Sequence, residues 1–444
     1  MRIIIVGAGA VGTHLAKLLS RENIDITLLD ESAERLNNLD VNYDMLTQVG
    51  SPTSIRDLKD ARVKDVNLFV AVTPQESVNM TACMIAHNLG AKKTLARIDN
   101  PEYLLPKHKD FFKNLGVDHL IYPEELAARE ITESLRTSWI RSHLEFCNGA
   151  LELFAIKIRA NASIINKKFS SGLLNHGKFR VVAIKRNSET IIPIGNDEIL
   201  ANDLVYFVTT KKDIDFLREQ AGKSDTDVKD IIFLGGGRIA QKTAQRICKS
   251  TRIKILEKCK ERSFYLSDKL ENTLVMNVDG RNVETLKEIG ASEADAFVSL
   301  TGNSETNILA CLAAKRLGID KTIAEVENID YIPLAESLDI GAVLNKKMIA
   351  ASYIYQLTLD ADVLNVHNLT SADAVVVEFI ATSGSKITKQ QVKDIKLPYS
   401  VNIGGLVRNG VGMTVNGDTQ VQANDQIIVF CVTSALRKLE KYFN

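Results

Sequence analysis

Two glycine-rich segments of the chain carry the residue types that bind the phosphate groups of a nucleotide. The first consists of Gly7, Ala8, Gly9, Ala10, Val11 and Gly12, directly after an apolar run at residues 3–6. In the spacing Gly-x-Gly-x-x-Gly, the first glycine allows a tight turn after a strand, the second lets a pyrophosphate approach the backbone, and the third lets the next helix pack closely. The N-terminus of that helix attracts the anion through its dipole and its N–H groups. We therefore predict a nucleotide site at residues 7–12.

An acidic residue stands where the ribose of such a nucleotide would lie. Asp30 follows the strand predicted at residues 24–29 and comes 30 − 9 = 21 residues after Gly9. Its carboxylate can accept hydrogen bonds from both ribose hydroxyls, and its negative charge would repel a 2′-phosphate. The pattern therefore favours NAD(H) over NADP(H).

Other candidate site residues follow the next strands of the same predicted sheet. Ser51 and Thr53 lie in the loop after the third strand, close to the expected adenine end of the ligand. Thr73 and Pro74 follow the strand at residues 66–72, and Arg97 ends the strand at 93–98 as a candidate phosphate partner. Ligands of open α/β sheets bind at this carboxyl edge. The structural alternatives are a helix cap for Thr73 and a surface or ion-pairing role for Arg97.

The second glycine segment shows that the chain is a duplication. It consists of Gly235, Gly236, Gly237, Arg238 and Ile239, and Gly235 lies 235 − 7 = 228 positions after Gly7. A second landmark has the same spacing, because Thr301 lies 301 − 73 = 228 positions after Thr73. Equal spacing at two separate landmarks indicates a repeated unit.

The second copy has diverged at its candidate site. Ala240 replaces the third glycine, Glu257 stands where Asp30 stood, and Glu325 takes the place of Arg97. The fingerprint tolerates the alanine, but the last exchange puts an anion where a phosphate-binding cation was expected. Nucleotide binding by this copy is expected to be weaker, altered or lost, and we favour some occupancy.

The apolar pattern predicts the fold class as α/β, with two Rossmann-like parallel-sheet domains, each followed by a small β-rich α+β domain. Apolar runs of strand length alternate with helical patterns in both copies, which is typical of a doubly wound parallel sheet. We expect Rossmann-like domains at residues 1–123 and 228–346, and β-rich domains at 143–226 and 366–444. Helices at 123–141 and 346–358 are expected to leave the two parallel sheets.

Composition limits the function classes. The 444 residues include 55 basic and 55 acidic ones, so no overall positive field would attract nucleic acid. No apolar run approaches the length of about 20 residues needed for a transmembrane helix, which predicts a cytoplasmic protein. The sequence shows neither a nucleophilic triad nor metal-ligand spacing, and no proton-transfer residue for a dehydrogenase stands out. These observations favour a nucleotide that acts as a signal in a protein that is not an enzyme.

Several of these features together resemble the TrkA family, whose repeated RCK modules each pair a Rossmann-like RCK-N domain with a β-rich RCK-C domain. The resemblance is carried by residues 7–12, Asp30, Thr73 with Asn79, and Arg97, followed by a β-rich domain and a second copy of the whole unit. It covers essentially the full chain. This sequence departs from the family pattern at residues 74–76, at residues 51–52 and in the second glycine segment.

The resemblance implies a peripheral regulatory subunit of a potassium-uptake system. Such proteins form homo-oligomeric rings, as dimers or tetramers, on the cytoplasmic face of the inner membrane, beneath a Trk-type membrane subunit that translocates K⁺. They bind NADH or NAD⁺ and, in some members, ATP or ADP. The implied mechanism is allosteric, with bound nucleotide favouring one arrangement of the ring.

Two other interpretations remain open from the sequence. An NAD-dependent oxidoreductase with an unrecognised substrate site would turn over its cofactor slowly and would need a catalytic Lys or His near the nicotinamide. A structural scaffold with relic glycines would bind no nucleotide and would be indifferent to Gly9→Asp.

Overall fold

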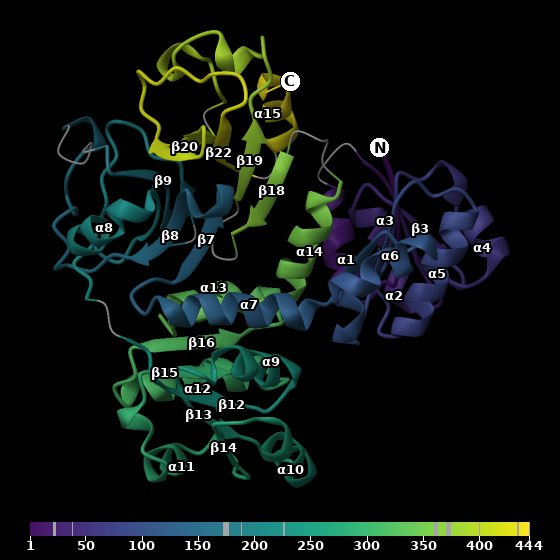
Figure 1. Ribbon diagram of the computed structural model, residues 1–444, viewed down its shortest axis with the longest axis horizontal. Coiled ribbons are helices and arrows are strands. Elements are labelled where there is room, and N and C mark those ends of the chain that lie inside the picture. Colours follow the sequence, from purple (N-terminus) through teal and green to yellow (C-terminus); the bar gives the residue numbers. More distant parts are fainter. Residues whose placement is uncertain are drawn as a thin grey trace. The chain divides into compact units, whose positions relative to one another are not determined.

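The computed structural model describes residues 1–20, 24–37, 39–171, 177–187, 189–224, 227–358, 363–369, 374–398, 400–432 and 435–443. The chain divides into two compact units (Figure 1), residues 1–126 with 346–359 and residues 127–345 with 360–444. Residues 225 and 226, which belong to the first expected β-rich domain, lie outside the described residues.

The first unit is built on a six-stranded parallel sheet in the order β3-β2-β1-β4-β5-β6. Its strands are β1 (Arg2–Val6), β2 (Asp25–Asp30), β3 (Leu46–Val49), β4 (Leu68–Ala71), β5 (Thr94–Arg97) and β6 (His119–Ile121). Its longest helices are α1 (Ala10–Leu19), α5 (Glu76–Asn88), α6 (Pro106–Asn114) and α14 (Lys346–Gln356). Its shorter helices are α2 (Ala33–Leu36), α3 (Leu39–Asn42) and α4 (Ile55–Asp60). The strand order reverses beside β1, where open α/β sheets bind their ligands.

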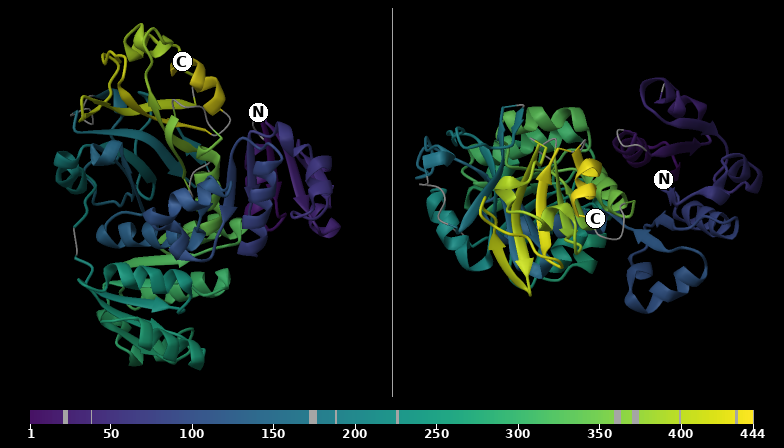
Figure 2. Two further views of the ribbon diagram at one scale, coloured as in Figure 1. Left: turned by 45° about the vertical axis from the view of Figure 1, so that its right-hand side comes forward. Right: turned by 90° about the horizontal axis from the view of Figure 1, so that it is seen from above.

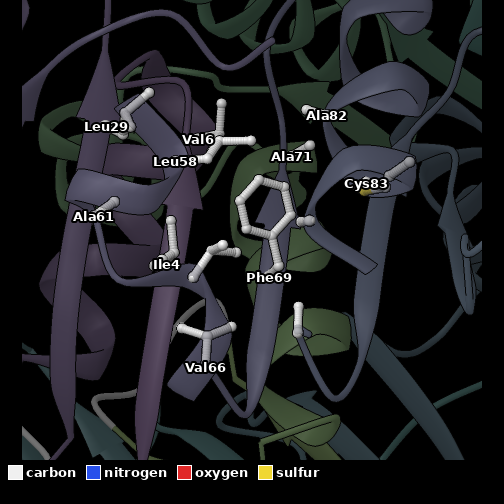
Figure 3. Close-up of a cluster of buried hydrophobic side chains, with 14 of the residues drawn as sticks. Ile4, Val6, Leu29, Leu58, Ala61, Val66, Phe69, Ala71, Ala82 and Cys83 are labelled. Atoms are coloured by element: carbon white, nitrogen blue, oxygen red, sulfur yellow. The ribbon is translucent and has the colours of Figure 1, made fainter. Parts of the chain in front are cut away.

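The core of this unit fixes β1 at the centre of the sheet. The helix α1 contacts β1, β2 and α14, whereas α5 contacts β4 and β5. Figure 3 shows Val6, Phe69 and Cys83 within one buried cluster, which also includes Leu58 from α4. The packed strands and helices form a rigid scaffold. The loops at the carboxyl ends of the strands lie outside this core, and such loops commonly carry binding residues.

The second unit contains a parallel sheet of the same design, in the order β14-β13-β12-β15-β16-β17. Its strands are β12 (Asp230–Leu234), β13 (Arg252–Leu256), β14 (Thr273–Met276), β15 (Ala296–Ser299), β16 (Lys321–Glu325) and β17 (Ala342–Leu344). Its helices are α9 (Arg238–Ile247), α10 (Lys260–Lys269), α11 (Val283–Glu288), α12 (Ser304–Arg316) and α13 (Ile332–Ser337). The repeated strand order confirms the tandem duplication.

Two five-stranded antiparallel sheets complete the second unit, in the orders β10-β9-β11-β8-β7 and β18-β19-β22-β20-β21. The strands of the first are β7 (Ser142–Phe146), β8 (Leu151–Lys157), β9 (Phe179–Arg186), β10 (Glu189–Ile191) and β11 (Leu204–Thr209). Those of the second are β18 (Val363–Asn368), β19 (Val375–Ile380), β20 (Val401–Arg408), β21 (Val411–Thr414) and β22 (Gln426–Cys431). The helices α8 (Ile214–Gln220) and α15 (Leu436–Phe443) follow them. The predicted fold class, α/β with β-rich α+β domains in tandem, is confirmed.

The two antiparallel sheets lie next to each other (Figure 2). Their side chains form one shared hydrophobic core, which the sequence pattern did not reveal. The rings of Tyr206 and Phe430 lie 5.8 Å apart across it. A Cβ on Gly404 would lie 2.7 Å from Val208, so this glycine permits the close approach of β20 to β11. Each β-rich domain therefore contributes buried side chains to a common interior, and the first also has a core of its own.

The expected exit helix at 123–141 is shorter than predicted. The helix α7 (Pro123–Arg136) ends five residues earlier, and β7 begins at Ser142. Between them, Trp139 and Ile140 are buried in the core of the first antiparallel sheet, where Trp139 contacts Phe154. Burial of these two side chains draws the backbone into the sheet domain and overrides the helical pattern.

Candidate nucleotide site

The first glycine loop has the backbone conformation that its residue types predict. Gly7 has a φ of +100° and donates its N–H to the Leu29 carbonyl at 2.8 Å. A side chain here would be strained, and its Cβ would lie 3.0 Å from the Thr73 nitrogen. A Cβ on Gly12 would lie only 2.0 Å from the Gly7 carbonyl oxygen. These two glycines close the turn between β1 and α1.

Gly9 differs from its neighbours because the space around it is empty. It is the N-cap residue of α1, and no side chain caps this helix terminus. A Cβ built on Gly9 would meet no heavy atom within 4 Å. The backbone at the start of α1 is thus open on the side where a pyrophosphate would approach, and the helix dipole favours an anion there.

Asp30 is held beside this loop by two backbone donors. The Ala8 N–H donates to Oδ2 at 2.7 Å, and the Ser32 N–H donates to Oδ1 at 2.8 Å. The residue is 7% exposed, and Arg35 Nη1 lies 3.6 Å from Oδ2. Each carboxylate oxygen can accept a further hydrogen bond. The carboxylate is therefore positioned to receive the two hydroxyls of a ribose.

A buried asparagine, which contributed to the family resemblance but was not predicted as a site residue, supports the loop after β4. Asn79 Oδ1 accepts hydrogen bonds from the Thr73 N–H at 2.9 Å and from the Thr73 hydroxyl at 2.7 Å. Its Nδ2 donates to the carbonyls of Thr73 and Arg97, each at 2.9 Å. Asn79 thus ties the ends of β4 and β5 together, and its recurrence as Asn307 was the available signal.

The remaining predicted residues lie at or just after the carboxyl ends of β3, β4 and β5. The Ser51 N–H donates to Asp57 at 2.8 Å, and its hydroxyl lies 3.4 Å from that of Thr53. Pro74 is exposed. Arg97 Nη2 lies 3.7 Å from Asp99 and 3.9 Å from Glu124, which is the ion-pairing arrangement considered for it. The parallel topology brings all of these residues to one sheet edge.

The second glycine loop repeats the backbone arrangement of the first. Gly235 has a φ of +96° and donates to Leu256 O at 2.8 Å, while Gly237 is the uncapped N-terminus of α9. Glu257 Oε2 accepts the Gly236 N–H at 2.8 Å, and Oε1 accepts the Cys259 N–H at 2.8 Å. The acidic residue is thus anchored in the same way as Asp30.

Side chains make the second loop different. Arg262 Nε donates to the Gly236 carbonyl at 2.9 Å, whereas Arg35 in the first copy faces the acidic residue instead. A Cβ on Gly236 would lie 2.3 Å from Leu266, so that side chain lies against the loop. The Arg238 side chain is exposed, and Ile239 is 5% exposed in the core. Glu325, where the first copy has Arg97, is 5% exposed.

The structure also gathers three residues that the sequence did not group. Glu133, His143 and Glu145 each place one nitrogen or oxygen atom of a type that can bind a metal ion within 4.8 Å of the others. Two of them already have partners, since His143 Nε2 lies 2.5 Å from Glu152 and Glu133 bonds Arg136 at 2.9 Å. Glu133 lies on α7 and the other two lie on β7, so the sequence offered no reason to group them.

The fold and its two glycine loops define a class of protein, namely a tandem dinucleotide-fold protein in which each parallel-sheet domain is followed by a small antiparallel one. The TrkA-N domain model matches residues 3–123 and 231–346, and the TrkA-C domain model matches residues 153–222 and 376–444. The chain therefore belongs to the TrkA family.

Curated relatives match over nearly their whole length. The Trk system potassium uptake protein TrkA of Halomonas elongata is 31% identical over 450 residues, covering 100% of this chain and 98% of the relative. That of Vibrio alginolyticus is 32% identical over 439 residues, covering 97% and 96%. A homologue from Methanosarcina mazei is 30% identical over 455 residues, covering 100% of both.

Solved structures support the fold. The crystal structure of the GsuK RCK domain has a TM-score of 0.62 at 14% identity and covers 100% of this chain and 94% of that one. The GsuK channel bound to NAD has a TM-score of 0.61 at 14% identity, with 100% and 78% covered. Among the described residues of the present chain, no helix combines the length and the apolar character that a membrane span requires.

Proposed function

We propose that this protein is a peripheral regulatory subunit of a potassium-uptake system, and that NAD(H) bound at the first glycine loop is its signal. Curated relatives that match over the full chain are named Trk system potassium uptake proteins. The observation that carries the nucleotide assignment is Asp30, anchored by Ala8 and Ser32 beside the open backbone at Gly9.

The bound ligand would contact the first copy in three places. Its pyrophosphate would lie at the start of α1 over Gly9, and its ribose hydroxyls would donate to Asp30. The loop at Ser51 and Thr53 would face the adenine, while Thr73 and Pro74 would line the opposite side. Arg97 is paired with Asp99 and Glu124, so its phosphate contact would require exchange of partners. ATP or ADP would use the same loop with fewer contacts.

The regulatory step would be allosteric and would involve a separate membrane subunit of the Trk type. Copies of this chain would form a ring on the cytoplasmic face of the inner membrane, as a dimer or a tetramer. Nucleotide can shift such a ring only through different affinities for its two arrangements, a coupling of typically about 1–3 kcal/mol.

We also propose the division into domains at residues 1–123, 143–226, 228–346 and 366–444.

Calorimetric titration with NADH, NAD⁺, ATP and ADP tests the nucleotide assignment. We expect Gly9→Asp to reduce NADH affinity at least 100-fold while leaving the melting temperature close to that of the wild type, because a Cβ at this position meets no heavy atom within 4 Å. Gly237→Asp is the matched control, since Gly237 holds the same position at the start of α9. Unchanged binding by Gly9→Asp would overturn the assignment and favour the scaffold interpretation.

Potassium uptake tests the regulatory role. The gene would be expressed in a bacterial strain that lacks its own Trk regulatory subunit but retains the membrane subunit. We expect the wild-type chain to restore growth at low K⁺ and Gly9→Asp to do so poorly.

A different result would support the oxidoreductase interpretation. The purified protein would then consume NADH steadily with a substrate found by screening, and Gly9→Asp would abolish this consumption.

A further inference from the structure

A cavity of about 620 Å³ lies inside the second unit, apart from both glycine loops. One wall is the first antiparallel sheet, with Lys157 on β8 and Lys185 on β9. The other walls come from α7 and from the segment between α13 and β17, which contains Asp339. Ligand pockets of small molecules typically measure about 300–1,000 Å³, so the cavity is large enough for one.

Cationic side chains crowd around a single carboxylate at this cavity. Arg141 Nη2 lies 2.5 Å from Asp339 Oδ1, and Arg159 pairs with the other oxygen of Asp339. Lys315, behind the wall, donates to the Asp339 carbonyl at 2.6 Å. Asp339 therefore balances only part of the positive charge that surrounds it.

Lys157 has the most available donor group. It lies two residues before Arg159, half-buried at the end of β8, and has no hydrogen-bond acceptor within the described part of the chain. A partly buried ammonium group without an acceptor is costly unless a bound group or water satisfies it. On α7, the buried hydroxyl of Ser134 also lacks a partner among the described residues.

The directions of the pKa shifts at and near the cavity agree with an excess of positive charge. Burial, followed by repulsion from Arg159 and Arg141, lowers the pKa of Lys223 to about 8, although Lys223 itself does not line the cavity. Burial and the same two arginines also lower the pKa of Lys157, against the opposing effect of Asp339. Two other acids line the cavity, Glu336 and Glu130, but burial raises the pKa of Glu130 to about 7. An anion would relieve the repulsion among these cations.

We propose that this cavity is a second ligand site, which binds a small phosphate-bearing anion between the first antiparallel sheet and the second parallel-sheet domain. Arg141 and Arg159 present planar guanidinium groups, which bind phosphate oxygens in pairs, and Lys157 adds a third charge. Because the lining comes from both domains, the bound anion would hold them together. This proposal does not depend on nucleotide binding at either glycine loop.

Titration with inorganic pyrophosphate tests the site. The full chain with both Gly9→Asp and Gly237→Asp would be used, so that the glycine loops do not contribute. We expect saturable binding in 0.15 M salt and at least a tenfold loss of affinity in Lys157→Gln. Lys211→Gln is the matched control, an exposed lysine of the same domain that does not line the cavity, and it should bind as the parent does.

A chemical readout locates the bound anion without relying on a variant. Lys157 and Lys211 would be modified with an amine-reactive reagent at pH 8 and quantified by mass spectrometry. Saturating pyrophosphate should slow modification of Lys157 at least tenfold and leave Lys211 unchanged. Absence of saturable binding, or binding that neither protects Lys157 nor weakens in Lys157→Gln, would overturn the proposal.

Discussion

The two glycine loops of this chain have nearly the same backbone and different side-chain surroundings. In both, a left-handed glycine follows the first strand, and a carboxylate accepts the next backbone N–H, at 2.7 Å for Asp30 and 2.8 Å for Glu257. In the second copy, however, Arg262 bonds the loop and Leu266 packs beside it. The comparison shows that the backbone turn is kept in both copies while the side chains around it change.

The largest expected effect tests the part that the two copies share. Asn79→Ala and Asn307→Ala should each lower the free energy of unfolding by about 3 kcal/mol, because buried donors and acceptors at two strand ends lose their partners. Urea denaturation of each variant measures this. Two similar losses would support equivalent structural roles, and a negligible loss in either copy would contradict them.

The third glycine position should separate the copies. In the first, Gly12→Ala should lower the free energy of unfolding by about 2 kcal/mol through overpacking, since its Cβ would lie 2.0 Å from the Gly7 carbonyl oxygen. The second copy already accommodates Ala240, which is fully buried. Ala240→Gly, compared by the same denaturation, should not stabilise the protein. An undiminished stability of Gly12→Ala would show that the first loop is as adaptable as the second.

Lysines stand at equivalent positions of the two copies, but only the one in the second copy should make the free energy of unfolding depend on pH. Burial lowers the pKa of Lys321 to about 7, and its Nζ donates to the Ile140 carbonyl at 2.8 Å, whereas Lys93 is exposed. Between about pH 7 and 10.5 the Lys321 amine is protonated in the unfolded chain and neutral in the folded chain. The free energy of unfolding therefore rises with pH in that window, and this gain is lost as the pH falls back through it. The rise from pH 7 to 9 should be about 2 kcal/mol larger in wild type than in Lys321→Met.

The control for this prediction is Lys93→Met, which should keep the wild-type pH slope in denaturation experiments. Lys321 is the first residue of β16, Lys93 directly precedes β5, and the two are separated by 321 − 93 = 228 residues. A wild-type slope in Lys321→Met would show that this amine remains charged in the folded protein.

The smallest of the expected effects concerns ligand affinity. Asp30→Ala should weaken NADH binding about tenfold, equivalent to about 1.4 kcal/mol, because two hydrogen bonds to the ribose are lost. Glu257→Ala should change the affinity of the strongest site less than twofold. Calorimetry measures both, and equal losses would contradict the functional asymmetry between the loops.

The sequence by itself determined the architecture and the outline of the first site. Strand-length apolar runs, the spacing of Gly7, Gly9 and Gly12, and Asp30 at the end of the next strand depend on local backbone chemistry and on a sheet topology that few connections permit. The 228-residue repeat then transferred the same architecture to the second half. The strand and glycine patterns were predictable because each is encoded within one short segment, and the second half was predictable because it repeats them.

Only the tertiary structure decided which side chains meet across long separations. It paired Arg97 with Glu124, ended α7 before Trp139, and buried Lys321 while leaving Lys93 exposed. It also joined the two antiparallel sheets in one core and gathered Arg141, Lys157 and Arg159 around a cavity. Such contacts depend on packing between elements that can lie 231 residues apart, as in the hydrogen bond from Cys147 Sγ to Glu378. No local sequence pattern encodes that geometry.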